Sequence, residues 1–245
     1  MSAEATLALT IGIAAVAFLY STVGHAGASG YIALMSLFGL AASVIRPTAL
    51  SLNILVSCLA TWQFWRAGHF SWRLFWPFAL TSTPLAFVGG YISLPTQLFK
   101  ILIGIVLLLS AARLLLRPIP DAVAHEPSRP VALSVGGVLG LLSGLTGTGG
   151  GIFLTPLLLF MRWAITKQAA ATSAAFILIN SLAGLFGNIV STRAFPTTAI
   201  PLAAAAVVGG AAGSYYGARR FDHRLIKRLL AVVLIIAGTK LILTR

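Results

Sequence analysis

The chain has very few acidic residues. Four of its 245 residues are Asp or Glu, and they lie in the N-terminus or in polar loops, at Glu4, Asp121, Glu126 and Asp222. Carboxylates inside apolar segments are the usual proton relays of membrane pumps. Their positions therefore exclude a carboxylate relay through the apolar part of the chain.

Cysteine is scarcer still. Cys58 is the single cysteine, so the chain forms no internal disulfide. It stands in an apolar stretch, which predicts a buried thiol with a packing role.

Charge of either sign is rare. Charged residues make up 9% of the chain and hydrophobic residues 58%, and the mean hydropathy is +0.98. This composition excludes a soluble domain and predicts an all-α polytopic membrane protein, whose partner is the lipid bilayer. The net charge of +13 would suggest a nucleic-acid partner in a soluble protein. Here we expect no nucleic acid, because cytoplasmic loops of membrane proteins collect Lys and Arg.

The hydropathy profile is repeated. The pattern of residues 5–116 recurs over residues 131–243, and a polar stretch with four prolines separates the two copies. We interpret residues 1–116 and 131–245 as two homologous transmembrane repeats and residues 117–130 as a linker. Each repeat holds five apolar elements, which in the first are 5–23, 31–45, 48–66, 74–92 and 98–116.

The basic residues indicate the orientation. Twelve of the 17 Lys and Arg face the cytoplasm if corresponding loops of the two repeats face opposite sides of the membrane. That arrangement needs an odd number of crossings per repeat and therefore inverted repeats, as in many secondary transporters. Four crossings per repeat, with parallel repeats, are the alternative. We expect a multi-pass protein of the cytoplasmic (inner) membrane, which could form a homo-oligomer.

Each repeat has a glycine-rich run before a short second apolar element. Residues 24–30 precede the element 31–45, and residues 147–151 precede the element 152–165. We predict in each repeat a helical hairpin with a glycine-rich unwound tip, plus three spanning helices. A helix N-terminus preceded by glycines offers free N–H groups to an anion. The alternative is that these glycines only let helices pack closely.

Close packing is our interpretation of two other sets of glycines, which we give no substrate role. They recur at every fourth position, at Gly136, Gly140 and Gly144 and at Gly209, Gly213 and Gly217.

The candidate substrate-binding residues come from the two tips and from the third element of each repeat. They are Gly24, His25, Gly27, Ser29, Gly30, Tyr31, Ser51, Asn53, Thr148, Gly149, Gly150, Gly151, Thr172 and Ser173. Hydroxyl and amide groups bind an anion or join helices, and for Asn180 and Asn188 the same two alternatives hold. His25 either gains and loses a proton during transport or only donates a hydrogen bond. We predict no catalytic residue, no metal site and no cofactor.

The second glycine run and the residues after it resemble the sulfite exporter TauE/SafE permease family. The resemblance rests on the stretches 147–157 (GTGGGIFLTPL) and 167–173 (KQAAATS), and on 23–31 (VGHAGASGY) in the first repeat. It implies a membrane permease for small sulfur-containing anions such as sulfite, thiosulfate or organosulfonates. The first run departs from the family's adjacent glycines, with Ala28 and Ser29 where the second has Gly149 and Gly150.

Three other functions compete with a permease. An anion channel uses the same half-helix dipoles and neutral polar lining. An intramembrane hydrolase is suggested by Ser29 within Gly27–Gly30, but it needs a histidine base within reach of the serine. The third alternative is a structural membrane scaffold, which would not explain why a glycine run occurs in both repeats.

Overall fold

Helices and the short connections between them make up the part of the chain that the structure describes. The computed structural model describes residues 3–92, 108, 111–112, 115, 125–193 and 197–243, and no strand occurs in these ranges. Five of the described helices are long and apolar enough to cross a membrane, over Ala3–Ser21, Ser43–Arg66, Arg129–Thr146, Thr166–Thr192 and Ala199–Arg219. The prediction of an all-α protein with several spans is confirmed. Most of the fifth predicted element, 98–116, and most of the linker lie outside the described residues.

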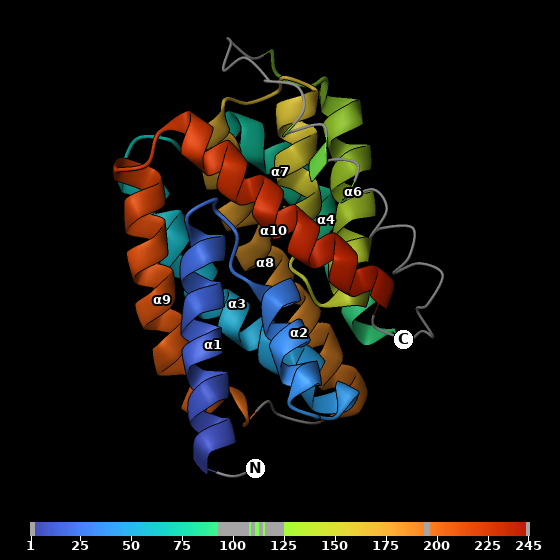
Figure 1. Ribbon diagram of the computed structural model, residues 1–245. Helices are drawn as coiled ribbons and strands as arrows, with labels where there is room; N and C mark the ends of the chain where they lie inside the picture. Colours follow the sequence, from blue (N-terminus) through green and yellow to red (C-terminus); the bar gives the residue numbers. More distant parts are fainter. Residues whose placement is uncertain are drawn as a thin grey trace.

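The helices follow one another in two series. The first series is α1 (Ala3–Ser21), α2 (Ala28–Leu37), α3 (Ala42–Arg66) and α4 (Trp72–Tyr91). The second is α6 (Arg129–Thr146), α7 (Gly151–Phe160), α8 (Thr166–Thr192), α9 (Ala199–Arg219) and α10 (His223–Leu243). Figure 1 shows the short helix α2 in the lower half of the bundle and the short helix α7 in the upper half.

The two series are interleaved. Helix α1 packs on α9, α4 packs on α6, and α3 packs on α8 in the middle of the bundle. Helix α10 runs obliquely across the front of the bundle in Figure 1, from the end of α9 toward the C-terminus. The three long helices of the first series therefore each rest on a long helix of the second.

The two sets of glycines at every fourth position make the closest of these contacts, as predicted. A Cβ on Gly136, Gly140 or Gly144 of α6 would collide with the backbone of α4. A Cβ on Gly209 or Gly213 of α9 would collide with the backbone of α1, and one on Gly217 with the backbone of Thr22, directly after α1. We call these two sets the glycine ridges of α6 and α9. The absence of side chains lets the paired backbones touch.

Several predicted boundaries were wrong. Helix α2 ends at Leu37 rather than residue 45, because Gly39 turns the chain with φ of +73°. Helix α3 begins at Ala42 rather than residue 48, since Pro47 lies near its N-terminal end, where a proline costs few helical hydrogen bonds. Helix α7 ends at Phe160, and α6 begins at Arg129, inside the predicted linker.

The outer surface is apolar. Cys58 is exposed, so the prediction of a buried thiol was wrong. Leu7, Ile11 and Trp62 are also more than half exposed. An apolar surface of this kind would cause aggregation in water, but it is the ordinary contact surface of a helix in lipid.

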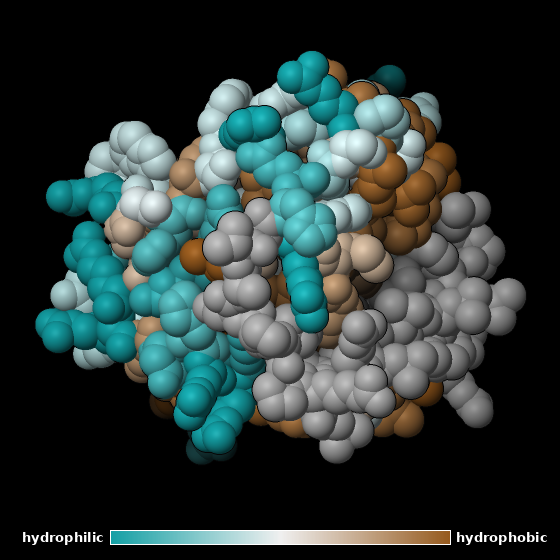
Figure 2. Space-filling model, turned by 90° about the horizontal axis from the view of Figure 1, so that it is seen from above, coloured by the Kyte–Doolittle hydropathy of each residue, from teal (hydrophilic) through white to brown (hydrophobic). Residues whose placement is uncertain are grey.

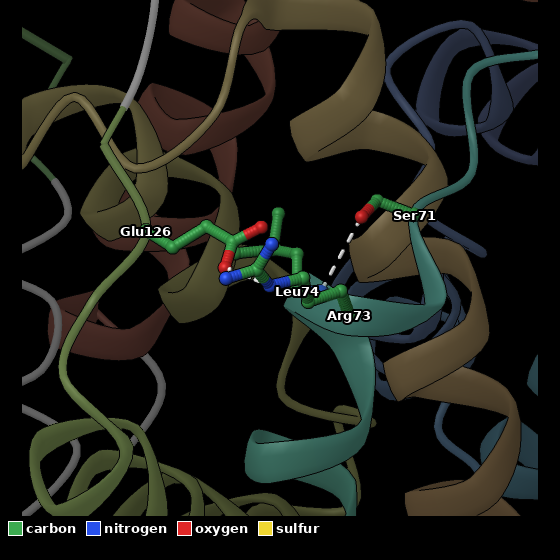
Figure 3. A network of polar contacts seen from close by, with 4 residues as sticks. All are labelled: Ser71, Arg73, Leu74 and Glu126. Carbon is green, nitrogen blue, oxygen red and sulfur yellow. Dashed lines mark hydrogen bonds and ion pairs between the residues drawn. The ribbon is translucent and has the colours of Figure 1, made fainter.

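Polar groups gather at the upper end of the bundle. Arg73 Nε lies 2.7 Å from Glu126 Oε2, which joins the start of α4 to the segment before α6. Ser71 caps α4 by accepting a hydrogen bond from Leu74 N (3.3 Å), as Figure 3 shows. The end of α9 lies nearby in the fold, because His69 Nε2 bonds to Ala218 O at 3.1 Å. Figure 2 shows hydrophilic side chains spread over this end.

Candidate functional site

The first glycine segment, residues 22–27, connects α1 to α2. Gly24 and Gly27 have φ of +77° and +109°, a region that favours glycine. Gly27 is the N-cap of α2, and no side chain caps this helix end. A Cβ on Gly24 would collide with the backbone of Ala170 in α8. The segment is therefore pressed directly against α8.

The protein's own side chains fill the space around this segment. The Tyr31 hydroxyl donates to Ala26 O (2.6 Å), and its ring covers Gly27. Ser29 Oγ donates to the Tyr20 hydroxyl oxygen at 3.0 Å. Gly30 packs against the side chain of Val16. The predicted binding residues Ser29 and Tyr31 are thus already engaged within the first repeat.

His25 connects the first glycine segment to the second series of helices. The side chain is 1% exposed, and its Nε2 lies 2.8 Å from Thr155 Oγ1 in α7. The Thr155 hydroxyl in turn donates to Ser173 Oγ in α8 at 2.7 Å. The structure therefore brings together two of the predicted site residues, His25 and Ser173, through a threonine between them.

The second glycine segment, residues 147–150, connects α6 to α7. Gly147, Gly149 and Gly150 have φ of +71°, +78° and +80°. Gly150 is the N-cap of α7, and again no side chain caps the helix. An uncapped N-terminus leaves backbone N–H groups and the positive end of the helix dipole directed at this segment.

Amide and hydroxyl groups surround the second glycine segment. Asn53 Nδ2 of α3 donates to Thr148 O (3.3 Å) and lies 3.4 Å from Ser181 Oγ of α8. A Cβ on Gly149 would come within 2.9 Å of both Asn53 Nδ2 and Ser181 Oγ. Only glycine leaves room here between the backbone and these donors.

One further hydroxyl near this segment has no partner. Ser143 is fully buried, and its Oγ makes no hydrogen bond to any residue that the structure describes. A Cβ on Gly150 would lie 3.2 Å from the Ser143 Cβ and 2.9 Å from the Phe176 ring. Gly151 packs against Ile177. Buried hydroxyls normally have partners, so the Ser143 hydroxyl is a further polar group that could contact a ligand at this segment.

The remaining candidates differ in whether their polar side-chain atoms make hydrogen bonds to described residues. The Ser51 hydroxyl donates to Pro47 O (2.9 Å) in its own helix. Thr172 and Asn180 are fully buried, and the Thr172 hydroxyl and both polar atoms of the Asn180 side chain have no hydrogen-bond partner. Asn188 is also buried, with 6% of its surface exposed.

Four polar residues near the segments escaped the sequence prediction, namely Tyr20, Ser143, Thr155 and Ser181. Thr155 could have been noticed, because it is the one hydroxyl residue in the otherwise apolar helix α7. The other three are separated from the glycine runs by residues with no distinguishing pattern.

Arg46 supports the second glycine segment from the side. Its guanidinium donates to the carbonyl oxygens of Gly89 (2.8 Å) and Ile92 (3.3 Å), and also to Gly144 O. The side chain therefore caps the C-terminal ends of α4 and α6 together. Its repeat counterpart Lys167 donates to Ala218 O at the end of α9 (3.4 Å). Both cations balance the negative ends of helix dipoles.

Both segments lack acidic neighbours. Glu4 lies in the first turn of α1, Glu126 pairs with Arg73, and Asp222 caps α10, so none of these three carboxylates reaches a glycine segment. The fourth acid, Asp121, lies outside the described residues. The second segment thus has hydrogen-bond donors and the Arg46 cation beside it and no described carboxylate, which suits an anion.

Comparison with known proteins identifies the family of the chain. The model of the family described as "Sulfite exporter TauE/SafE" matches residues 8–241. The chain belongs to the TauE/SafE family. Its match takes in both glycine segments and all the described helices apart from a few terminal residues.

Two relatives of this TauE/SafE protein carry transporter names. The "Probable membrane transporter protein y4hK" of Sinorhizobium fredii is 39% identical over 99% of this chain and 100% of its own length. The "Probable membrane transporter protein YunE" of Bacillus subtilis is 28% identical over 67% of this chain and 68% of its own. No solved structure matches the chain significantly. The TauE/SafE protein is a member of a family of membrane transporters.

The contacts of Ser29 bear on the hydrolase alternative. Ser29 Oγ donates to Tyr20, whereas His25 Nε2 bonds to Thr155 and His25 Nδ1 has no hydrogen-bond partner. The serine and the histidine are therefore not paired as nucleophile and base.

Proposed function

We propose that this TauE/SafE protein is a permease, a secondary transporter for small sulfur-containing anions such as sulfite, thiosulfate or organosulfonates. The anion binds at the second glycine segment, at the N-terminus of α7. One observation carries the proposal: Gly149 lies where any side chain would strike Asn53 Nδ2 and Ser181 Oγ, beside a helix end that no side chain caps.

Neutral donors suit a transported anion. Backbone N–H groups, an amide and hydroxyls stabilise a negative charge through dipoles, and the dipole of α7 adds to them. They form no ion pair with the substrate, so the anion can leave as well as bind. An oxoanion of sulfur has several acceptor oxygens, which match donors that converge from α3, α7 and α8.

The two glycine segments do not offer an anion the same surroundings. Our sequence-based prediction places the anion between the N-termini of α2 and α7. Around α2, however, Tyr31 covers Gly27 and Ser29 is bonded to Tyr20. These contacts favour the second glycine segment as the principal site and give the first segment a supporting part, through the contact of His25 with Thr155.

We also propose that the two repeats are inverted. The first helix of each repeat packs on the fourth helix of the other, α1 on α9 and α6 on α4. The short helices α2 and α7 lie in opposite halves of the bundle (Figure 1). Arg46 caps α4, and its counterpart Lys167 caps α9. These reciprocal contacts are what a two-fold axis in the membrane plane would produce.

The location and orientation follow from the basic residues. Arg66, Arg73 and Arg129 belong to the polar upper end of the bundle, with Arg219 and Arg220 at the end of α9. By the positive-inside rule this end faces the cytoplasm, and we place the protein in the cytoplasmic (inner) membrane.

Thermal unfolding of the purified protein tests the binding site. The midpoint is measured against sulfite, thiosulfate, sulfate, taurine and chloride at constant ionic strength. A specific anion raises the midpoint as its concentration rises, because it binds the folded state. We expect one or a few sulfur oxoanions to do so, and Gly149→Ala to abolish the shift.

Gly39→Ala is the matched control. Gly39 has φ of +73°, close to that of Gly149, but its position is open, with nothing within 4 Å of a Cβ. Both variants therefore carry the same backbone strain, and only Gly149→Ala fills the site. Equal shifts for chloride and the sulfur oxoanions, or an undiminished shift in Gly149→Ala, would contradict the proposed site. Uptake into liposomes that follows voltage passively, without saturation, would indicate a channel.

A further inference from the structure

His25 is a buried titratable group, and binding of the anion does not by itself require a residue that can gain a proton. It is 1% exposed and stands in the first glycine segment, where a smaller or apolar residue would fill the space without the cost of burying an imidazole. The hydrogen bonds around it define which of its two nitrogens carries a proton.

The hydroxyl of Thr155 decides the tautomer of His25. A hydroxyl has one hydrogen, and Thr155 donates that hydrogen to Ser173 Oγ. Thr155 Oγ1 must therefore accept from His25 Nε2, at 2.8 Å, so Nε2 carries the hydrogen. In a neutral imidazole the other nitrogen, Nδ1, is then bare.

The bare nitrogen has no hydrogen-bond partner in the part of the chain that the structure describes. His25 Nδ1 is buried there. Gly151 is the first residue of α7. Thr155, which His25 Nε2 contacts, lies one helical turn after Gly151, so the imidazole lies near the helix end that forms the proposed anion site.

The surroundings of His25 supply no countercharge. The Tyr20 ring of α1 packs on it, with centroids 6.5 Å apart, and Tyr31 of α2 interacts with Tyr20. Helices α7 and α8 present the neutral hydroxyls of Thr155 and Ser173. None of the described carboxylates lies in this part of the fold.

We infer that His25 is the coupling-ion site of the transporter, that the ion is a proton bound at Nδ1, and that proton and anion bind together. This inference rests on the proposed function. An imidazolium buried without a countercharge is costly. An anion at the start of α7, one helical turn (about 5.4 Å) from Thr155, supplies the missing charge. The anion stabilises the proton on His25, and the proton stabilises the anion to the same extent.

Transport then moves one proton with each anion. The proton enters at Nδ1 when the site is open to one side and leaves from Nδ1 when the site is open to the other. Thr155 and Ser173 are positioning residues, because they hold the Nε2 hydrogen in place and leave Nδ1 free. A pH gradient would therefore drive accumulation of the anion on the alkaline side.

Proton uptake on binding is the first test. Thiosulfate is the probe, because its own charge does not change between pH 5 and 8. It is added to the weakly buffered purified protein at pH 6.5 with a pH indicator. We expect the wild type to take up close to one proton per bound anion, His25→Gln to take up none, and the loop variant His69→Gln to match the wild type.

Two measurements separate a coupling role from a structural one. A pH gradient should increase thiosulfate uptake into liposomes for the wild type and for His69→Gln, but not for His25→Gln. Thr155→Val removes the acceptor of the Nε2 hydrogen, so it should move the midpoint of proton uptake to lower pH. A residue that only holds the fold would not move this midpoint.

The outcomes distinguish this proposal from the proposed function. If the wild type binds neither thiosulfate nor any other sulfur oxoanion, the proposed function fails, and the coupling proposal with it. If the wild type binds the anion without taking up a proton, or if His25→Gln takes up as many protons as the wild type, only the coupling proposal is overturned. If His25→Gln does not fold, the wild-type proton count and the Thr155→Val midpoint decide, and an unmoved midpoint overturns it.

Discussion

A single side chain, that of Arg46, joins the ends of two helices. One guanidinium, with its planar set of donors, holds the ends of α4 and α6 together through carbonyl groups of both helices. A lysine at this position has one ammonium group and cannot reach all of these carbonyls.

We therefore predict that Arg46→Lys lowers stability by roughly 2 kcal/mol, a fall of about 5 °C in the unfolding midpoint. Arg66→Lys is the control on the same helix. Arg66 is exposed, and its guanidinium lies over the ring of Trp62. Thermal unfolding in detergent measures both. Equal midpoints for the two variants would show that Arg46 is not a cap.

His69 makes stability depend on pH. It lies in the connection between α3 and α4, where partial burial lowers the pKa of its imidazole below the usual value, and nearby Lys167 and His223 lower it further. The unfolded chain then binds a proton at a higher pH than the folded protein does. Stability is therefore full above the ordinary histidine pKa and falls as the pH drops below about 6.5.

The prediction is that the unfolding midpoint falls between pH 7.5 and pH 5.5, and that His69→Gln reduces this fall. Glutamine keeps a donor for Ala218 O, which His69 Nε2 contacts, but it does not titrate. A fall of the same size in the variant would assign the pH dependence to other groups.

At the scale of elements, helix pairing depends on the glycine ridges. Gly140 of α6 faces the backbone of Ser82 in α4, whereas the neighbouring Gly137 faces the side chain of Leu85, with Cδ1 3.0 Å from a Cβ. The backbone of a packed helix cannot move aside to make room for a methyl group, but the end of a leucine side chain can.

Gly140→Ala should therefore destabilise the protein by about 1–3 kcal/mol. Gly137→Ala should change stability by less than about 1 kcal/mol, because the alanine's helix propensity offsets the small shift of Leu85. The midpoints of thermal unfolding compare the two. A larger loss for Gly137→Ala would mean that α4 and α6 pack in a different register.

Elements were predictable from the sequence where a period or a composition specified them. Hydropathy located the long helices, and the glycine periodicity at residues 136–144 and 209–217 identified faces that do touch backbones. The ends of α2 and α3 were not predictable, because a proline such as Pro47 breaks a helix in its middle and is tolerated near its start.

The candidate site was predictable only in part, for a related reason. Its glycines are contiguous in sequence and therefore visible. Of its polar neighbours, Asn53 was among the predicted candidates but Ser143 and Ser181 were not, since the three residues reach the second glycine segment from three different helices. Which hydroxyls share a site depends on helix rotation, and for Ser51 the rotation leaves its hydroxyl on its own helix.

The whole molecule has a direction in the membrane that a labelling experiment can determine. Arg162 and Arg193 form a matched pair, because both are exposed and both have positive φ, at +55° and +53°. They lie after α7 and after α8, at opposite ends of the long helix α8. A single cysteine at either position, in a Cys58→Ala background, reports the side that it faces.

We expect R193C to react with a membrane-impermeant maleimide in intact cells, and R162C to react only after the membrane is opened. This follows from a cytoplasmic upper end, where the arginines gather. Reaction of both cysteines from outside would contradict the proposed orientation. If R162C reacts in intact cells and R193C reacts only after the membrane is opened, the repeats are still inverted, but the protein has the opposite orientation in the membrane.

The pairing of α1 with α9 also constrains how the protein is made. The ribosome releases α1 first and α9 near the end of translation, yet the backbones of these two helices touch along the ridge of Gly209, Gly213 and Gly217. Through most of synthesis, α1 must wait in the bilayer or against the insertion machinery with that surface uncovered. A ribosome that stalls before α9 therefore leaves the oldest helix of the chain without its partner and exposed to membrane proteases.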